Sequence, residues 1–138
     1  MSKLLFEATH LTPEYLDQVV RCQIDVKIPS LNQYVSECRR NRYAGAKMKR
    51  DTEEAVSWYL ARLPKFRNPI FIRFHWVEKS RKRDLDNVSG FGRKCILDAM
   101  VKMGIIPDDR QKFVKGFCDS MSIGKKNRVI LYIEEVTT

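Results

Sequence analysis

Apolar and polar side chains alternate along two stretches of the chain, and both stretches predict strands. Every second residue of 21–28 is apolar, beginning with Cys22, and the residues between them are charged or polar. Residues 69–78 repeat the pattern more strongly. The shared face of this second stretch consists of Ile70, Ile72, Phe74 and Trp76. A period of two is typical of a strand that buries one face.

Two other stretches repeat their apolar residues at helical spacing. The first runs from about 46 to 63 and ends at Pro64, and the second runs from about 88 to 103 and is followed by Gly104. Proline cannot continue a helix, and glycine suits the position after a helix end. The strongly basic segment 37–50 is interpreted as a loop that leads into the first helix.

The remaining pattern completes a single-domain fold. Two more strands are expected at about 112–122 and 128–136, joined by a short turn. Residues 1–20 look like an N-terminal appendage, with a helix start near Thr12. We therefore predict an α/β (α+β) domain over 21–138, with a mixed sheet of about four strands flanked by helices in the order β-α-β-α-β-β.

The charge balance points to the kind of partner. The chain has 26 Lys and Arg residues against 17 Asp and Glu residues, a formal net charge of +9. A domain this basic usually meets a polyanion, and nucleic acid is the leading candidate. The alternative is a basic surface without a specific partner. The sequence contains neither a long apolar run nor a secretory pattern, so we expect no membrane association and a cytoplasmic protein.

The cysteines and histidines argue against a zinc site. No two of the four cysteines form a C-x-x-C pair, and the two histidines, His10 and His75, are isolated. Cys22 and Cys95 fall at apolar positions of their segments, which predicts buried free thiols in a reducing compartment.

Residues 79–87 place two carboxylates at the end of a run of cations. The cations are Lys79, Arg81, Lys82 and Arg83. Asp84 and Asp86 follow, and in an extended chain their side chains would project to the same side. Two carboxylates ~5 Å apart repel by about 3 kcal/mol at an effective dielectric of about 20. A bound Mg²⁺ would offset this repulsion, because it takes one or two carboxylates and completes its shell with water and phosphate oxygens.

This arrangement predicts a metal-dependent reaction on a phosphate backbone. The cations would hold the backbone, and a metal at the acids would activate water for phosphodiester cleavage. The segment "PDD" offers Asp108 and Asp109 as further acids. The 88–103 helix runs away from the first pair, so the chain must double back for the acids to meet. A following strand beside the 70–78 strand is expected to achieve this.

Each of these residues also has a structural interpretation. Asp86 or Asn87 would serve as a helix N-cap, and "PDD" would form a turn. Lys94 would lie on a solvated helix face, paired with Asp98 four residues on, or would act as a cation beside the scissile phosphate. The "SGFGRK" segment lacks the spacing of a phosphate-binding loop, so no nucleotide cofactor is expected.

Taken together, the motifs resemble those of the RusA-type Holliday junction resolvases, small phage- and prophage-associated endonucleases. The resemblance rests on "KRDLDN", "KCILDAM" and "MGIIPDD", and "PSLNQY" after the first strand also matches. It covers about 22–136, and the block at 79–109 is its specific part. In this chain the spacing from "DN" to the matching lysine is longer, and the basic segment at 37–50 is expanded.

The resemblance implies a homodimer that depends on Mg²⁺, with Mn²⁺ as a substitute, and makes paired cuts in a four-way DNA junction in a bacterial or phage-infected cell. By position, Asp84, Asp86 and Asp109 match the essential metal-binding carboxylates, and Lys94 matches the essential lysine. The expected DNA-binding residues are Lys79, Arg81, Lys82, Arg83, Arg93, Arg110 and Lys112. The alternatives are a nuclease for flaps or replication forks and a non-catalytic DNA-binding accessory protein on the same fold.

Overall fold

The computed structural model describes residues 19–108, 110 and 112–136. Its elements are β1 (Val20–Ile24), α3 (Leu31–Arg40), α4 (Arg42–Leu60), β2 (Ile70–Glu78), α5 (Leu85–Lys102), β3 (Val114–Ile123) and β4 (Arg128–Glu135). The predicted α/β single domain with a mixed four-stranded sheet is confirmed. No helix among these residues is long and apolar enough to cross a membrane.

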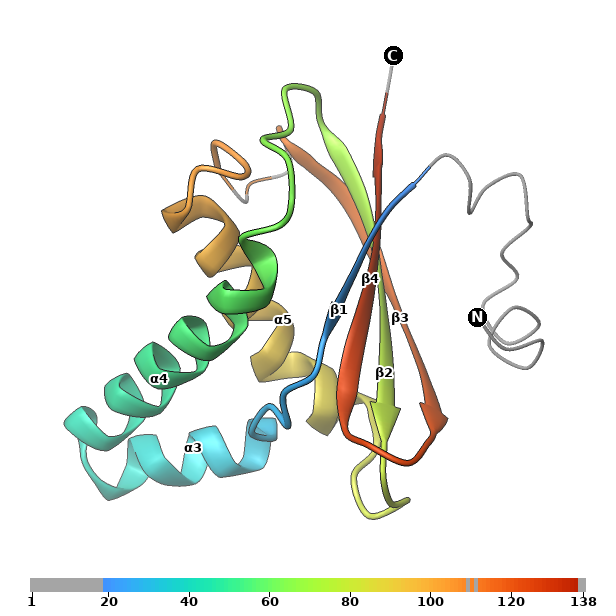
Figure 1. Cartoon of the computed structure of the whole chain (residues 1–138). Coiled ribbons are helices and arrows are strands. Elements are labelled where there is room, and N and C mark those ends of the chain that lie inside the picture. Colours follow the sequence, from blue (N-terminus) through green and yellow to red (C-terminus); the bar gives the residue numbers. More distant parts are fainter. Residues whose placement is uncertain (1–18, 109, 111, 137–138) are drawn as a thin grey trace.

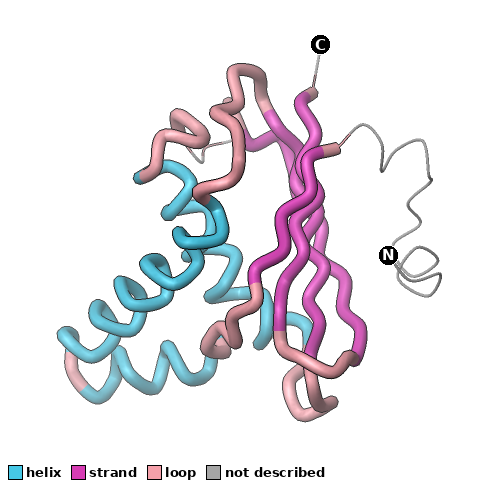
Figure 2. Tube along the Cα trace, viewed as in Figure 1, coloured by secondary structure: helices cyan, strands magenta, loops and turns pink. Residues whose placement is uncertain are grey.

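The strands lie in the order β1-β4-β2-β3. Both β1 and β2 run antiparallel to β4, whereas β3 runs parallel to β2. Figures 1 and 2 show the described helices on one side of this sheet. The segment β2-α5-β3 is therefore a crossover unit, in which the helix carries the chain back along the sheet before the next parallel strand begins.

The core lies between the sheet and the helices. The predicted inner face of β2 is confirmed, because Ile70, Ile72, Phe74 and Trp76 are all buried. Cys22 and Cys95 are buried free thiols, as expected. Burial raises the pKa of the Cys95 thiol to about 12, so it stays protonated at neutral pH. Each fully buried large apolar side chain contributes about 1.5–3 kcal/mol to stability.

Helix α3 was not predicted, and the element order is β-α-α-β-α-β-β. Ser30 begins α3 with a capping box, in which its hydroxyl accepts from the Gln33 N–H and the Gln33 side chain accepts from the Ser30 N–H. Asn41 ends α3 and at the same time caps α4, where its side chain accepts from the Ala44 N–H. The basic segment 37–50 is thus helical, interrupted only at Asn41.

Several predicted boundaries also shift. Strand β1 ends at Ile24 rather than at residue 28, and α4 covers 42–60 rather than 46–63. Helix α5 begins at Leu85, three residues earlier than expected. The helix start near Thr12 lies outside the described residues.

Candidate functional site

Asp84 is the N-cap of α5. Its Oδ1 accepts a hydrogen bond from the Asn87 N–H at 2.9 Å, and Asp86 lies in the first turn of the helix. A side chain of this segment does cap the helix, as the structural interpretation predicted, but the cap is Asp84 rather than Asp86 or Asn87. The assumption of an extended chain was wrong, because the helix begins directly after Asp84. The two carboxylates are held by a helix terminus rather than by a strand.

Both carboxylates remain available to a ligand. Asp84 and Asp86 are exposed. Within the described residues neither forms an ion pair, and the cap uses only Oδ1 of Asp84. The positive end of the helix dipole stabilises negative side chains here. Oxygen atoms of this kind suit Mg²⁺, which needs only one or two carboxylates beside water and phosphate oxygens.

A three-acid metal site is not present among the described residues. They contain no group of three or more His, Cys, Asp or Glu side chains that would hold a metal ion. Asp109, the third expected ligand, lies outside the described residues. Its proposed role therefore stays a prediction.

Arg83 fastens the end of β2 to the loop that precedes α3. Its Nε and Nη2 donate to the two Glu78 carboxylate oxygens at 2.7 and 2.9 Å, and its Nη1 donates to the Ile28 carbonyl at 2.9 Å. The two side chains are only 15% and 6% exposed. The guanidinium is thus already occupied, and we leave Arg83 out of the proposed DNA contacts. It instead fixes the backbone next to Asp84.

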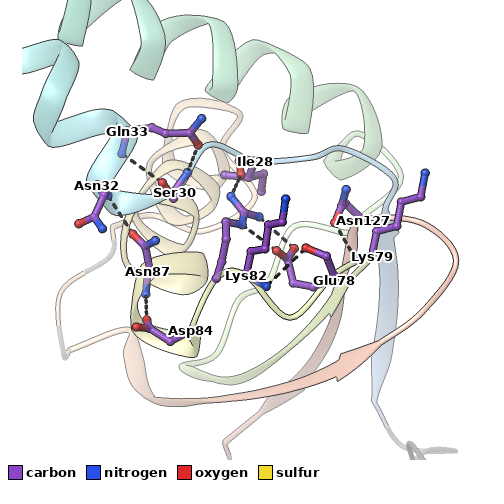
Figure 3. Close-up of polar contacts among 12 residues, drawn as sticks. Ile28, Ser30, Asn32, Gln33, Glu78, Lys79, Lys82, Asp84, Asn87 and Asn127 are labelled. Carbon is purple, nitrogen blue, oxygen red and sulfur yellow. Dashed lines mark hydrogen bonds and ion pairs between the residues drawn. The ribbon is translucent and has the colours of Figure 1, made fainter.

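Asn87 connects two of the sequence motifs, "KRDLDN" and "PSLNQY". Its N–H donates to Asp84, and its side-chain Oδ1 accepts from the Asn32 N–H at 2.9 Å (Figure 3). Tyr34 stacks on Phe91 with 4.3 Å between ring centroids, which packs α3 against α5. The motif "PSLNQY" therefore supports the start of α5. This contact was missed in the sequence, where the capping box at Ser30 was its only local signal.

Three cations of the basic run are exposed in the loop between β2 and α5. They are Lys79, Arg81 and Lys82. The loop is anchored where the Lys79 N–H donates to the Asn127 side chain at 2.9 Å (Figure 3). None of the three side chains has an ion-pair partner in the described part of the chain. These charges are free to contact an anionic ligand beside Asp84 and Asp86.

The segment around "PDD" lies at the opposite end of the sheet. Helix α5 has 18 residues, which span about 27 Å. Because β3 starts beside the start of β2, residues 108, 110 and 112 precede β3 at the far end from Asp84. In Figure 1 the loop before α5 and the loop after it lie at opposite ends. The expectation that a returning strand brings the acids together was wrong, because that strand is parallel.

Asp108 has the turn role expected of it. Its Oδ1 accepts from the Arg110 N–H at 2.9 Å, and β3 begins only at Val114. Asp108 and Arg110 thus belong to a turn and not to a strand. Arg110 and Lys112 are exposed at this end, away from Lys79, Arg81 and Lys82.

Lys94 makes the ion pair that its structural interpretation predicts. Its Nζ lies 3.2 Å from Oδ1 of Asp98, and its side chain is 60% exposed. Burial of Asp98 would raise its pKa, but hydrogen bonds from Lys49 and Lys94 outweigh burial and lower it. Eight residues of helix separate Lys94 from Asp86, about 12 Å along the axis. Lys94 is therefore not adjacent to the two acids of its own chain.

Arg93 connects α5 to the sheet. It donates to Oδ2 of Asp119 on β3 and lies over the Phe117 ring, 4.3 Å from its centroid. Oδ1 of Asp119 also accepts from the Trp76 indole N–H at 3.0 Å. These contacts give Arg93 a structural role and were not anticipated from the sequence.

Comparison with protein-family models and with curated proteins found no match for this chain. The resemblance to RusA-type resolvases therefore rests on the sequence motifs alone.

Proposed function

We propose that the protein is a metal-dependent endodeoxyribonuclease that cleaves branched DNA, with the four-way junction as its expected substrate. One observation carries the proposal. Two exposed carboxylates, Asp84 and Asp86, are held at a helix start directly beside the exposed cations Lys79, Arg81 and Lys82. The cations attract phosphates, whereas unneutralised acids at the same place would repel them.

A divalent cation would resolve this conflict. Asp84 and Asp86 would hold Mg²⁺ or Mn²⁺, which when bound polarises a phosphodiester and lowers the pKa of a water ligand. The chain's own residues position the substrate. Lys79 and its neighbours bind the backbone, and the cap at Asp84 and the Arg83–Glu78 pair hold the acids in place.

A third carboxylate must come from a second copy if Asp109 belongs to this site. The described residues around "PDD" lie about 27 Å from Asp84 along α5, too far to share an ion within one chain. This separation supports the expected homodimer. Two copies that each contribute one end of the sheet would combine Asp84 and Asp86 of one chain with Asp109 of the other.

Strand β3 offers a route to such a dimer. It is an edge strand of the described sheet, and its side chains Phe117 and Ile123 are 47% and 46% exposed. An unprotected edge is a template for pairing with another chain. Antiparallel pairing of two β3 strands would put the start of one beside the end of the other. The "PDD" end of one copy would then lie at the same end of the joint sheet as Asp84 of its partner.

The second candidate is a DNA-binding accessory protein without catalytic activity. The separation of the acids within one chain favours it, because the described residues contain no three-acid group. The exposed cations would support binding in either case, so only a cleavage assay separates the two candidates.

The test is incubation of the protein with a labelled four-way junction, a flap and a linear duplex, with Mg²⁺ and with EDTA. We expect cleavage of the junction in Mg²⁺ or Mn²⁺ only. Asp84→Asn and Asp86→Asn should abolish cleavage but retain DNA binding, because each removes a negative charge near phosphate. Asp25→Asn, which changes an exposed acid in the loop after β1, is the matched control and should cut normally.

Cutting in EDTA would rule out the metal mechanism. Binding without cleavage of any branched substrate would favour the accessory protein. Loss of DNA affinity in both aspartate variants would show that these acids are only structural.

A further inference from the structure

Helices α3 and α4 meet in an exposed, strongly basic corner. We call it the basic corner and define it by Arg39, Arg40, Asn41, Arg42 and Tyr43. All five residues are exposed, and the Tyr43 side chain is 72% exposed, an unusual position for a large aromatic residue. The Arg42 guanidinium lies 5.1 Å from the centroid of the Tyr43 ring, so it covers one face at most.

The backbone of the basic corner is held where the two helices meet. Asn41 donates its backbone N–H to the Glu37 carbonyl at the end of α3, and its side chain accepts from the Ala44 N–H at the start of α4. A few residues on, Gly45 packs so closely on Cys38 that a Cβ atom would overlap the Cys38 sulfur. These contacts fix the angle between the two helix ends that carry the cations and the aromatic ring.

Helix stability accounts for Arg39 and Arg40, which lie in the last turn of α3, but not for Arg42. The first turn of α4 has no acidic residue and begins with Arg42, although the positive end of the helix dipole disfavours a cation there. A groove of about 520 Å³ lies beside the corner, and its lining includes Tyr43 and two ion pairs, Arg40 with Glu37 and Lys47 with Asp51. Arg39 and Arg42 do not line the groove and have no ion-pair partner among the described residues. The charge and the exposed ring are suited to an anionic, flat ligand.

The basic corner is linked directly to the candidate nuclease site. The first turn of α3 is bound to Asn87 at the start of α5, and the ten residues of α3 span about 15 Å to the corner. Figure 1 shows α3 running outward from this region to the corner. At about 3.4 Å per nucleotide of one strand, the length of α3 corresponds to roughly four nucleotides.

We propose that the basic corner binds a nucleotide at the branch point of DNA held in the nuclease site. The free face of Tyr43 stacks on a base that is unstacked at the branch point, and Arg39 and Arg42 contact the flanking phosphates. Aromatic stacking with nearby cations is the general chemistry of binding to unpaired nucleotides. Duplex DNA offers the same phosphates but no free base face, so the corner favours branched over linear DNA. This inference rests on the proposed function and specifies its substrate.

The same helix provides a matched control. Trp58 is 79% exposed, but it lies fifteen residues after Tyr43, about 22 Å along the helix. The acidic residues Asp51 and Glu54 separate it from the basic corner. A general effect of removing an exposed aromatic residue from α4 would therefore occur equally at Trp58.

The experiment measures binding by fluorescence anisotropy in EDTA, which prevents metal-dependent cleavage. The probes are a four-way junction with 2-aminopurine at the branch point and a linear duplex of equal length. Tyr43→Ala should weaken junction binding about 5- to 100-fold and change duplex binding less than about 2-fold. Tyr43→Phe, which retains the ring, and Trp58→Ala should bind like the wild type. The 2-aminopurine fluorescence should be quenched by the wild type and by Tyr43→Phe but not by Tyr43→Ala.

Equal binding of the junction by Tyr43→Ala and the wild type would overturn the inference, as would an equal loss with Trp58→Ala. If instead Tyr43→Ala loses the same affinity for the junction and for the linear duplex, the corner contacts only phosphates and the stacking role is wrong. If the wild type cleaves junctions but Tyr43→Ala does not change junction binding, only this inference is refuted and the proposed function stands. A wild-type protein that binds neither DNA refutes the proposed function as well.

Discussion

Two chains should build one site of the proposed nuclease, because Asp84 and the described residues beside Asp109 lie at opposite ends of α5. Carboxylates that share a Mg²⁺ each lie about 2 Å from the ion, so their oxygens are at most about 4 Å apart. The described residues beside Asp109 are separated from Asp84 by the full length of α5, about 27 Å. The gap is the length of the helix itself, so a rearrangement within one chain that closes it would have to unfold part of α5.

Mixed dimers of two inactive variants test this geometry. Asp84→Asn and Asp109→Asn should each be inactive alone. If the acids come from different chains, a mixed dimer contains one site with both substitutions and one site with none. Random pairing makes about half of the dimers mixed, so the mixture should recover about a quarter of the wild-type sites.

The assay is nicking of one labelled strand of a four-way junction in Mg²⁺. The two variants are co-expressed with different tags and purified through both, which isolates the mixed dimer and raises the expected recovery to about half. The control pair is Asp84→Asn with Asp86→Asn. These two acids belong to the same chain, so this mixed dimer should stay inactive.

No nicking by the purified Asp84→Asn/Asp109→Asn dimer would refute the shared site. Recovery by the control pair would show that the activity comes from exchange or contamination rather than from complementation. Full activity of Asp109→Asn alone would place the third carboxylate elsewhere.

Further predictions follow from single contacts. Arg83→Ala should lower the free energy of unfolding in urea by about 3–5 kcal/mol, because it leaves the Glu78 carboxylate buried and unpaired. Arg81→Ala, at an exposed position, should change this free energy by less than about 0.5 kcal/mol. Equal effects of the two substitutions would contradict the stabilising role of the Arg83–Glu78 pair. Arg81→Ala combined with Lys82→Ala should reduce the slope of log affinity against log salt by roughly 1.4–1.8, and an unchanged slope would place DNA on another surface. Burial, and then the nearby positive charge of Arg128, lower the pKa of His75 to about 4. The unfolded chain therefore binds more protons than the folded protein between pH ~6.5 and ~4, and stability should fall as pH falls through this window, by at most about 1.4 kcal/mol per pH unit; His75→Asn, compared by urea unfolding at pH 7.5 and 4.5, should lose less, and an equal loss would assign the effect to other groups.

The strand faces could be predicted because burial on one side leaves a period of two in the sequence. The inner face of β2 is the clearest case. Helix α3 was missed although Leu31, Tyr34, Val35 and Cys38 recur at helical spacing, because this apolar stripe is short and none of its residues is buried. The cap at Ser30 and the side chain of Gln33 were a second signal, which follows a local rule rather than a periodic one.

The sequence placed Asp84 and Asp86 next to a run of cations, but it did not predict the geometry of the candidate site. The predicted N-cap, Asp86 or Asn87, lies two or three positions after the observed cap, Asp84, and this difference decides whether the two acids lie on a strand or at a helix start. The direction of β3 is not encoded in its own residues. It follows from the strand-helix-strand order, because such crossovers join parallel strands. That rule would have placed "PDD" at the far end of the sheet.

The buried pair of Arg83 and Glu78 should respond to salt differently from the exposed cations. Screening acts on exposed charges such as Lys82 within about a Debye length, but acts far less on a pair that is largely enclosed by protein. High salt should therefore release a nucleic-acid ligand while the anchoring of Asp84 is unchanged. Inhibition by salt would then be immediately reversible on dilution, without a refolding lag, and the maximal rate at saturating substrate would be preserved.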